Sequence, residues 1–200
     1  MTSLIIAGVI FMILLYALVR SGRFGDLPDN EELLNIQNPL ATEVFSADSV
    51  LMGKYYIQNR NDVDSSGLTT GLINALIATE DSRFYQHKGI DTRSLFRVFF
   101  KTLLLQDPGS GGGSTLSQQL AKNLYPRKKD GFLSLPGSKL REMLIARRLE
   151  NVYTKQEIIV LYLNTIPFGE NTFGIKSAAQ RFFNKNPDAL NMEEAALLVG

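Results

Sequence analysis

Residues 109–125, GSGGGSTLSQQLAKNLY, form a glycine-rich loop that runs directly into a helix-forming segment. Such a junction presents free backbone amides and the positive end of a helix dipole, which together suit a phosphate group. No Gly-Lys-Ser/Thr follows the glycines, so the stretch is not a Walker A loop. On composition alone, a flexible linker explains the glycine-rich stretch equally well. However, the short predicted helix after the glycines holds more polar residues than core packing needs. They are Ser114, Gln118, Gln119, Lys122 and Asn123.

Basic side chains concentrate directly after this loop. Residues 122–148 carry eight basic side chains against two acidic ones, a net charge of +6 in a chain whose total is +1. Lys139 and Glu142 in this region stand three residues apart and share a helix face, although a surface ion pair of little energetic value has the same spacing. A cationic zone beside a possible phosphate site predicts an anionic, phosphate-bearing substrate. The near-zero total charge gives no reason to expect a nucleic-acid partner.

A further candidate segment lies at residues 78–91, ATEDSRFYQHKGID. Glu80 ends a predicted helix whose other residues are nearly all apolar, and partial desolvation there favours a proton-accepting carboxylate. A helix-end ion pair with Arg83, three residues on, explains the same spacing. His87 in the following turn is more typical of a hydrogen-bonded structural histidine than of a catalyst.

Composition narrows the chemistry that the chain can perform. The 200 residues include no cysteine and one histidine, which excludes disulfide bonds, thiol nucleophiles and multi-histidine metal sites. No serine is followed three positions later by lysine, so the Ser-x-x-Lys nucleophile of transpeptidases is absent as well. The groups that remain available for catalysis are carboxylates, lysines, arginines and backbone amides.

The N-terminal segment is predicted to be a membrane anchor. Leu4 to Val19 holds sixteen residues without a charge, about 24 Å as a helix. With its flanks it approaches the roughly 30 Å hydrocarbon core of a bilayer. No basic segment precedes it and no small-x-small site follows, so we expect an uncleaved anchor at residues 1–25 rather than a signal peptide or a buried helix. Arg20 and Arg23 follow, and a positive-inside count alone would place the C-terminal side in the cytoplasm.

The remaining residues predict a mainly α domain. Asp29-x-x-Glu32 behind Pro28 indicates a short helix, and residues 42–45 and 50–57 predict a small β-hairpin within a linker at 26–67. Residues 68–200 have helical periodicity throughout. The expected helices cover about 69–80, 92–105, 115–124, 138–152, 155–164, 174–183 and 192–199.

Four ordered motifs resemble those of glycosyltransferase family 51, the transglycosylase domain of class A penicillin-binding proteins and of monofunctional peptidoglycan glycosyltransferases. The first motif, Glu-Asp-x-x-Phe-x-x-His-x-Gly-x-Asp, is matched at Glu80, Asp81, Phe84, His87, Gly89 and Asp91. The second, Gly-Gly-Ser-Thr-x-x-Gln-Gln-x-x-Lys-Asn, is matched without a gap from Gly112 to Asn123. The fourth resembles residues 154–169, which include Asn164.

The third motif, Arg-Lys-x-x-Glu, departs from the family at one position. It is kept at Lys139 and Glu142 but has Ser138 where arginine is usual, which removes one positive charge. Arg141 and Arg127 are the candidates to replace that charge.

The resemblance covers residues 26–200 and implies a lysozyme-like, largely helical domain at 68–200 behind its anchor. It implies a peptidoglycan glycosyltransferase that polymerises lipid II into β-1,4-linked glycan strands and releases undecaprenyl pyrophosphate, with inversion at the donor carbon. By resemblance, Glu80 is the general base and Glu142 the second essential carboxylate. Pyrophosphate or substrate binding falls to Lys122, Lys139, Ser114, Thr115, Gln119 and Asn123. Supporting motif residues are Asp81, Phe84, His87, Gly112, Gly113 and Asn164.

The same resemblance implies a setting for the enzyme. The expected partners are the membrane, lipid-linked glycan and other cell-wall synthesis and division proteins. The catalytic domain is expected on the extracytoplasmic, periplasmic side of the inner membrane, with Arg20 and Arg23 at the headgroups. Mg²⁺ or Mn²⁺ commonly accompanies the leaving pyrophosphate in this family, although the sequence shows no complete ligand set. The helical pattern at 193–200 stops without a cap, so the domain is expected to be cut short.

Two other functions are compatible with parts of this pattern. One is a peptidoglycan-cleaving lysozyme or lytic transglycosylase, whose glutamate acts as an acid. A glycosidase has no pyrophosphate to hold, so the Gly-Gly-Ser-Thr helix and the lysines favour the transferase. The other is an inactive membrane-tethered scaffold, against which the intact Glu80 and Glu142 speak.

Overall fold

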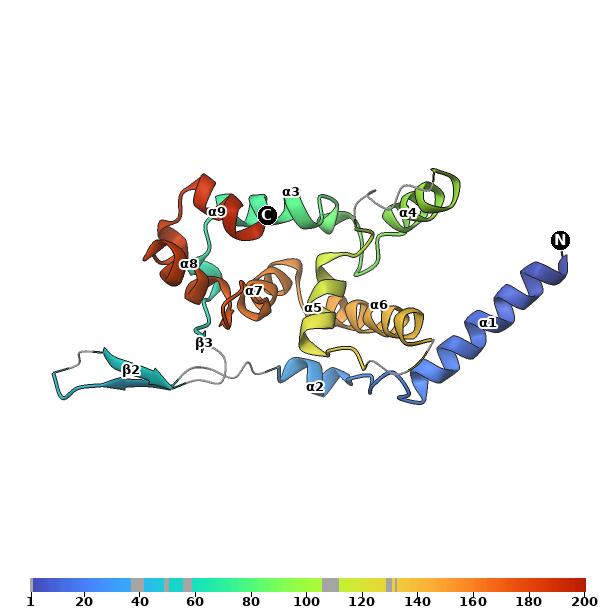
Figure 1. Ribbon diagram of the computed structural model, residues 1–200, viewed down its shortest axis with the longest axis horizontal. Coiled ribbons are helices and arrows are strands. Elements are labelled where there is room, and N and C mark those ends of the chain that lie inside the picture. The colour runs from blue at the N-terminus through green and yellow to red at the C-terminus, as the bar shows by residue number, and fades with distance from the viewer. Residues whose placement is uncertain are drawn as a thin grey trace. The chain divides into compact units, whose positions relative to one another are not determined.

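The computed structural model describes residues 2–36, 42–48, 51–55, 59–105, 112–128, 131 and 133–200. These residues are mainly helical (Figure 1). The helices are α1 (Thr2–Arg20), α2 (Asn30–Leu34), α3 (Thr70–Glu80), α4 (Thr92–Leu105), α5 (Leu116–Leu124), α6 (Ser134–Val152), α7 (Lys155–Thr165), α8 (Ile175–Phe183) and α9 (Met192–Val199). The strands are β1 (Thr42–Phe45), β2 (Leu51–Tyr55), β3 (Asn59–Arg60) and β4 (Thr172–Phe173).

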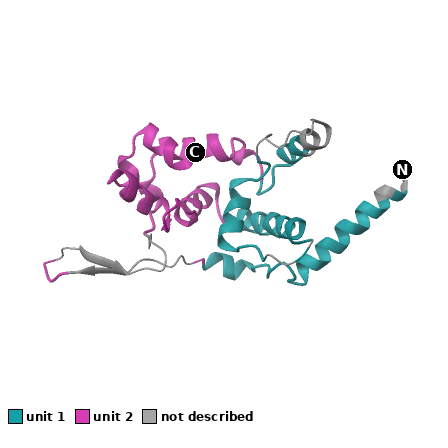
Figure 2. Ribbon diagram, viewed as in Figure 1, with its two compact units in different colours: residues 1–35, 88–152 teal, residues 36–87, 153–200 magenta. Residues whose placement is uncertain are grey.

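The chain divides into two compact units, and each is built from two separate stretches of sequence (Figure 2). Unit 1 comprises residues 1–35 and 88–152, and unit 2 comprises residues 36–87 and 153–200. The candidate residues of the second and third motifs therefore belong to unit 1. Glu80 and the fourth motif belong to unit 2.

The helices predicted after residue 68 are all present, and six of the seven end and begin within one residue of their predicted bounds. Polar side chains at the N-caps explain this agreement for α3, α5, α7 and α9. Thr69 accepts a hydrogen bond from the amide of Leu72, and Thr154 and Asn191 each form a complete capping box with a glutamate three residues on. Such caps satisfy amides that have no partner inside the helix.

Helix α6 begins at Ser134, one turn before the predicted residue 138. The predicted start was wrong because Pro136 and Gly137 look like breakers in the sequence. Pro136 is the third residue of the helix, where its missing amide would have had no intrahelical partner. Gly137 is needed because a Cβ there would lie 2.4 Å from ring atoms of Phe24.

Unit 1 is organised around α6, which packs against α1, α2 and α5. An apolar cluster of Leu15, Val19 and Phe24 joins the N-terminal segment to residues of α6. Arg141 strengthens this connection because its Nε and Nη2 donate to the carbonyl oxygen of Asp26 at 3.1 and 2.9 Å. Its Nη1 donates to the carbonyl oxygen of Tyr125 at 3.1 Å, so one buried guanidinium holds two distant backbone segments on α6.

Unit 2 has its own core between its helices. Helix α9 packs against α3 and α8, and α7 packs against α8. The short strands β3 and β4 pair in parallel, with Asn59 opposite Thr172. Asn164 on α7 donates from Nδ2 to the carbonyl oxygen of Val63 at 2.8 Å and accepts from the Val63 amide at 3.0 Å. This supporting residue of the fourth motif therefore fixes the backbone that leads into α3.

Strands β1 and β2 lie in the segment predicted to form a hairpin. They pair antiparallel, with Thr42 opposite Tyr55, and the register is irregular between Val44 and Phe45. This pairing agrees with the predicted hairpin. Residues 50, 56 and 57 of that prediction lie outside the described residues.

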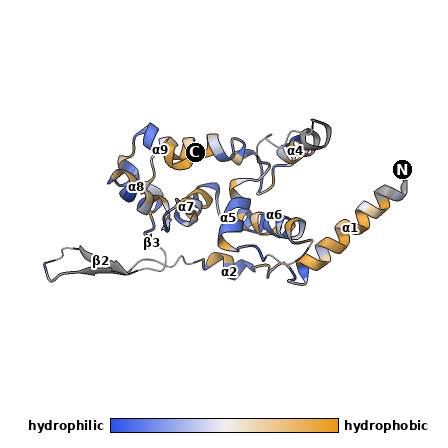
Figure 3. Cartoon of the chain, in the orientation of Figure 1, coloured by the Kyte–Doolittle hydropathy of each residue, from blue (hydrophilic) through white to orange (hydrophobic). Residues whose placement is uncertain are grey.

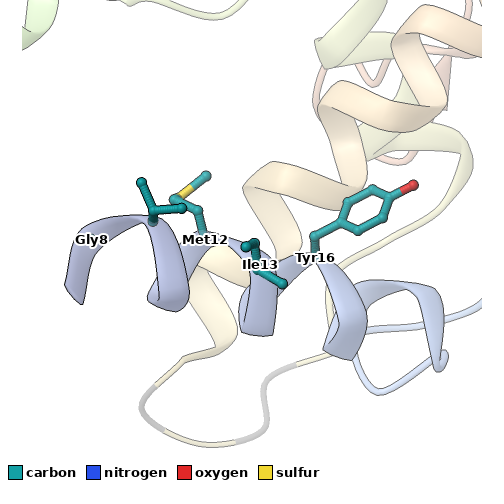
Figure 4. Close-up of a pocket in the computed structure, with 5 residues that line it drawn as sticks. Gly8, Met12, Ile13 and Tyr16 are labelled. Atoms are coloured by element: carbon teal, nitrogen blue, oxygen red, sulfur yellow. The ribbon is translucent and has the colours of Figure 1, made fainter. Parts of the chain in front are cut away.

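Helix α1 carries a long run of apolar side chains (Figure 3). Leu15 and Val19 are buried in the unit 1 core, whereas many of the large side chains whose burial the structure describes on this helix are exposed. These are Ile6, Val9, Ile10, Phe11, Met12, Ile13, Leu14 and Tyr16. Figure 4 shows four of the residues that line a shallow apolar pocket along this helix, Gly8, Met12, Ile13 and Tyr16. Among the residues that the structure describes, no helix is both long and apolar enough to cross a membrane, so the anchor predicted at 1–25 is not confirmed.

Gly89 supplies a test of packing within unit 1. Its φ is +82°, and a Cβ there would lie 2.8 Å from the backbone carbon and oxygen of Ala146 on α6. We expect Gly89→Ala to lower the free energy of unfolding for two reasons. Backbone strain contributes about 1–3 kcal/mol, and overpacking against α6 adds about 1–3 kcal/mol. Gly169 has a similar φ of +84° but open space around it, so Gly169→Ala should cost only about 1–2 kcal/mol. Urea unfolding of both variants measures the difference, and equal losses would contradict the close approach to α6.

Candidate active site

Glu142 is a buried carboxylate held by two cations in unit 1. It lies in the middle of α6 and is 3% exposed. The Nε of Arg127 donates to its Oε1 at 2.6 Å, and the Nη2 of Arg127 donates to its Oε2 at 3.1 Å. Lys139 Nζ lies 3.4 Å from the same Oε2. A buried charge is tolerated only when it is paired in this way.

Lys139 connects this carboxylate to the glycine-rich loop. Its Nζ donates to Ser114 Oγ at 2.5 Å, and Ser114 directly precedes Thr115, the N-cap of α5. Burial lowers the pKa of Lys139, although the negative charge of Glu142 opposes the shift. The hydrogen bond of the Arg127 guanidinium with Glu142 raises the pKa of Arg127. The structure therefore brings together three residues predicted from two separate motifs: Ser114 from the second, and Lys139 and Glu142 from the third.

The start of α5 is fixed by buried polar contacts. Thr115 Oγ1 donates to the carbonyl oxygen of Gly89 at 2.7 Å and accepts from the amide of Gln118 at 3.2 Å. Gln118 Nε2 donates to the same carbonyl oxygen at 3.2 Å. Thr115 was predicted to bind substrate, and its hydroxyl is engaged within the protein as part of this support.

The other predicted residues of the second motif are more accessible than Thr115. Lys122 and Gly112 are exposed, whereas Gly113, Gln119 and Asn123 are half-buried. A Cβ at Gly113 would lie 3.2 Å from Val98 Cγ2, so this glycine lets the loop pass close to α4. The motif thus combines a fixed loop and cap with polar side chains that reach the surface of α5.

Glu80 is the last residue of α3 in unit 2 and is half-buried. The turn after it is held by its own contacts. The amide of Asp81 caps α3 by donating to the carbonyl oxygen of Ile77, and the Asp81 carboxylate contacts His87 Nε2 at 3.0 Å. His87 is therefore hydrogen-bonded, as its sequence context indicated.

Two residues that sequence reasoning missed also surround this turn. Lys155 at the start of α7 donates from Nζ to the carbonyl oxygen of His87 at 2.8 Å. The same Nζ lies 4.1 Å from the centre of the fully buried Phe84 ring, which is a cation–π contact. Tyr162 on α7 is buried, and burial together with the charge of Glu80 raises its pKa. Neither residue has a spacing signal, because each reaches the turn from another helix.

The structure distinguishes the two arginines that could replace the missing cation of the third motif. Arg141 is committed to the carbonyl oxygens of Asp26 and Tyr125, whereas Arg127 contacts Glu142. Ser138 is 2% exposed, and its hydroxyl has no hydrogen-bond partner among the described residues. Of these two arginines, Arg127 is therefore the one that places a positive charge beside Glu142.

The divalent ion implied by the family resemblance remains a prediction. Within the described ranges, no three His, Asp or Glu side chains lie together in a way that could hold a metal ion. Both oxygens of Glu142 already contact cationic side chains. The described residues do not form a protein metal site, and we assign no step to such an ion.

Comparison with known proteins agrees with the motifs. A family model described as Transglycosylase matches residues 48–200. Similar relatives are penicillin-binding protein 1A of Escherichia coli (36% identical over 174 residues, 87% of this chain) and of Vibrio cholerae (36% over 196 residues, 98% of this chain). The chain covers 20% and 23% of these two proteins, about a fifth of their length. The chain belongs to the transglycosylase family, which confirms the resemblance drawn from its motifs.

The lowered pKa of Lys139 has a measurable consequence for stability. Between that lowered value and 10.5, the pKa of an ordinary lysine, the unfolded chain binds more protons than the folded chain. The free energy of unfolding therefore gains a contribution from Lys139 as pH rises through this window. We expect the stability of the wild type minus that of Lys139→Met to increase between neutral pH and pH 10.5, measured by urea unfolding. A difference that stays constant with pH would contradict the burial of this ammonium group.

Proposed function

We propose that this chain is the glycosyltransferase part of an enzyme that polymerises lipid II into β-1,4-linked glycan strands in bacterial cell-wall synthesis. The observation that carries the proposal is the linked set of Glu142, Lys139 and Ser114 beside the glycine-rich loop, in a chain of the transglycosylase family. Such a set combines a fixed carboxylate with a half-buried ammonium group next to a helix N-terminus. This combination suits a reaction whose leaving group is a pyrophosphate.

Glu80 acts as the general base in this proposal. The acceptor's 4-hydroxyl is a poor nucleophile while neutral, and Glu80 accepts its proton as the oxygen attacks C1 of the donor sugar. The bond between C1 and the pyrophosphate oxygen breaks, and its electron pair leaves with undecaprenyl pyrophosphate. Attack opposite the leaving group inverts C1 and gives the β-1,4 bond. The turn that fixes Asp81, His87 and Phe84 holds Glu80 in place for this step.

Lys139 and Lys122 act on the leaving group. Negative charge develops on the pyrophosphate as the C1–O bond breaks, and positioned cations stabilise that charge most effectively where water is partly excluded. Lys139 is half-buried and held by Ser114, and Lys122 lies on the surface of α5. Gln119 and Asn123 supply neutral hydrogen-bonding groups on the same helix. Glu142 orients or stabilises the reacting centre.

The finer setting of the enzyme also belongs to this proposal. We take the domain to be lysozyme-like, and helix α1 to anchor it as a single pass with the catalytic part on the periplasmic side. The exposed apolar side chains from Ile6 to Tyr16 support a lipid contact for α1. Growing lipid-linked glycan, other cell-wall synthesis and division proteins, and Mg²⁺ or Mn²⁺ at the pyrophosphate are the further expected partners.

Polymerisation of lipid II tests the assignment of the two carboxylates. We expect Glu80→Gln to lower the turnover of lipid II by about 10²–10⁴-fold, the usual effect of removing a general base. Glu142→Gln should lower turnover by a similar factor. Glu170→Gln is the matched control, since Glu170 is an exposed carboxylate that pairs with Arg181. Gels that separate polymer from labelled lipid II, sampled over time, give the rate of lipid II turnover.

The same experiment separates the alternatives. Incubation with finished glycan in place of lipid II would release muropeptides if the protein were a lysozyme-like or lytic enzyme. Absence of any Glu80-dependent product from either substrate would indicate a scaffold. Either result would reject the glycosyltransferase proposal.

Membrane contact through α1 is tested with lipid vesicles. Ile13 is 64% exposed on α1, and a carboxylate in its place costs roughly 2.5–3.5 kcal/mol inside a bilayer. Ile13→Asp should therefore lower co-sedimentation with phosphatidylethanolamine–phosphatidylglycerol vesicles by about tenfold or more. Leu197→Asp is the control, because Leu197 is 74% exposed on α9. Equal binding of both variants and the wild type would exclude α1 as the lipid contact.

A further inference from the structure

We propose that Arg127 is the positioning residue for Glu142 and replaces, from outside helix α6, the arginine that the third motif lacks at Ser138. The inference rests on the proposed glycosyltransferase activity and adds a residue to it. It assigns Arg127 no contact with substrate. Arg127 acts by fixing the carboxylate that the proposed function assigns to the reacting centre.

The contact between Arg127 and Glu142 has the geometry of a positioning contact. Nε and Nη2 of one planar guanidinium each meet a different carboxylate oxygen, at 2.6 and 3.1 Å. Two parallel bonds fix the plane of the carboxylate, which a single point charge does not do. Lys139 contacts one oxygen at 3.4 Å, so it adds charge with much less control of orientation.

Burial distinguishes this pair from an ordinary surface ion pair. The side chain of Glu142 is 4% exposed, whereas that of Arg127 is 33% exposed. The arginine therefore reaches a buried carboxylate from the edge of the unit. Arg181 and Glu170 form the same kind of arginine–glutamate ion pair without burial, because their side chains are 48% and 63% exposed.

The position of Ser138 explains why a substitute is needed. Ser138 lies four residues before Glu142 on α6, and side chains four apart on a helix are neighbours. An arginine at 138 could reach the Glu142 carboxylate from the same helix. The serine hydroxyl is buried and has no hydrogen-bond partner among the described residues, so it does not make this contact. Arg127 comes instead from the segment that follows α5.

The other nearby arginine is already committed. Arg141 uses Nε, Nη1 and Nη2 on the carbonyl oxygens of Asp26 and Tyr125. Its replacement would loosen the backbone around α6, so its role is to hold the fold of unit 1. Arg127 is thus the arginine whose donors the structure places on a predicted catalytic group.

Kinetics with lipid II test this role. Misplacing a catalytic group by about 1 Å can cost about 10²-fold in rate. We expect Arg127→Ala to lower kcat by about 10²-fold while KM changes by less than about threefold, because Arg127 acts on orientation and not on substrate binding. Arg127→Lys should recover part of the loss, since lysine restores the charge but not the fork. Arg181→Ala, which removes the exposed pair, should leave kcat unchanged.

A rescue variant distinguishes positioning from a structural role. Arg127→Ala combined with Ser138→Arg restores an arginine within reach of Glu142, and kcat should rise at least about tenfold over Arg127→Ala alone. If Arg127 had only a structural role, Arg127→Ala would lower thermal stability, and adding Ser138→Arg would not restore kcat. If the doubly substituted protein does not fold, as judged by circular dichroism, the comparison of Arg127→Lys with Arg127→Met decides. The lysine variant should then be at least about tenfold faster.

Each outcome bears on one proposal or on both. A wild type that makes no polymer from lipid II overturns the proposed function and this inference with it. A polymerising wild type whose Arg127→Ala variant keeps kcat within about threefold overturns the inference alone. Failure of both the position-138 rescue in a folded protein and the lysine replacement also overturns it.

Discussion

The buried negative charge of Glu142 is the constraint on which unit 1 depends. A carboxylate in the middle of a helix that faces a core is unfavourable unless cations and hydrogen-bond donors surround it. Arg127 and Lys139 meet this requirement from two different segments, and Lys139 extends the contact to Ser114 before α5. One charge thus links helix α6, the glycine-rich loop and the segment after α5. One of the groups that make the charge tolerable, Lys139, is also the group that the proposed function assigns to the leaving pyrophosphate.

The helices of this protein were predictable because their signals are local. Thr69, Thr154 and Asn191 cap helices at the predicted places, and apolar periodicity defines the lengths between caps. The start of α6 was missed for an equally local reason. Pro136 and Gly137 are tolerated only because one is in the first turn and the other lies against Phe24.

The candidate site was only partly predictable for the opposite reason. The motifs identified Glu142, Lys139 and Ser114, but spacing alone allowed the first two to be a surface pair. The contacts that decide their role come from Arg127, fifteen residues before Glu142, and from burial by other helices. Lys155 and Tyr162 were missed for the same reason, because each reaches the Glu80 turn from another helix, α7. Such contacts leave no periodic pattern in a sequence.

The interleaving of the two units has a consequence for biosynthesis. Each unit needs two stretches of chain separated by more than fifty residues, so neither corresponds to a continuous polypeptide. On the ribosome, residues 1–35 must wait until α6 has emerged before unit 1 can close. Unit 2 depends in turn on residues made after α6. Unit 1 can therefore close before unit 2 is complete, but until α6 has emerged the buried side chains of α1 have no partner helix to pack against.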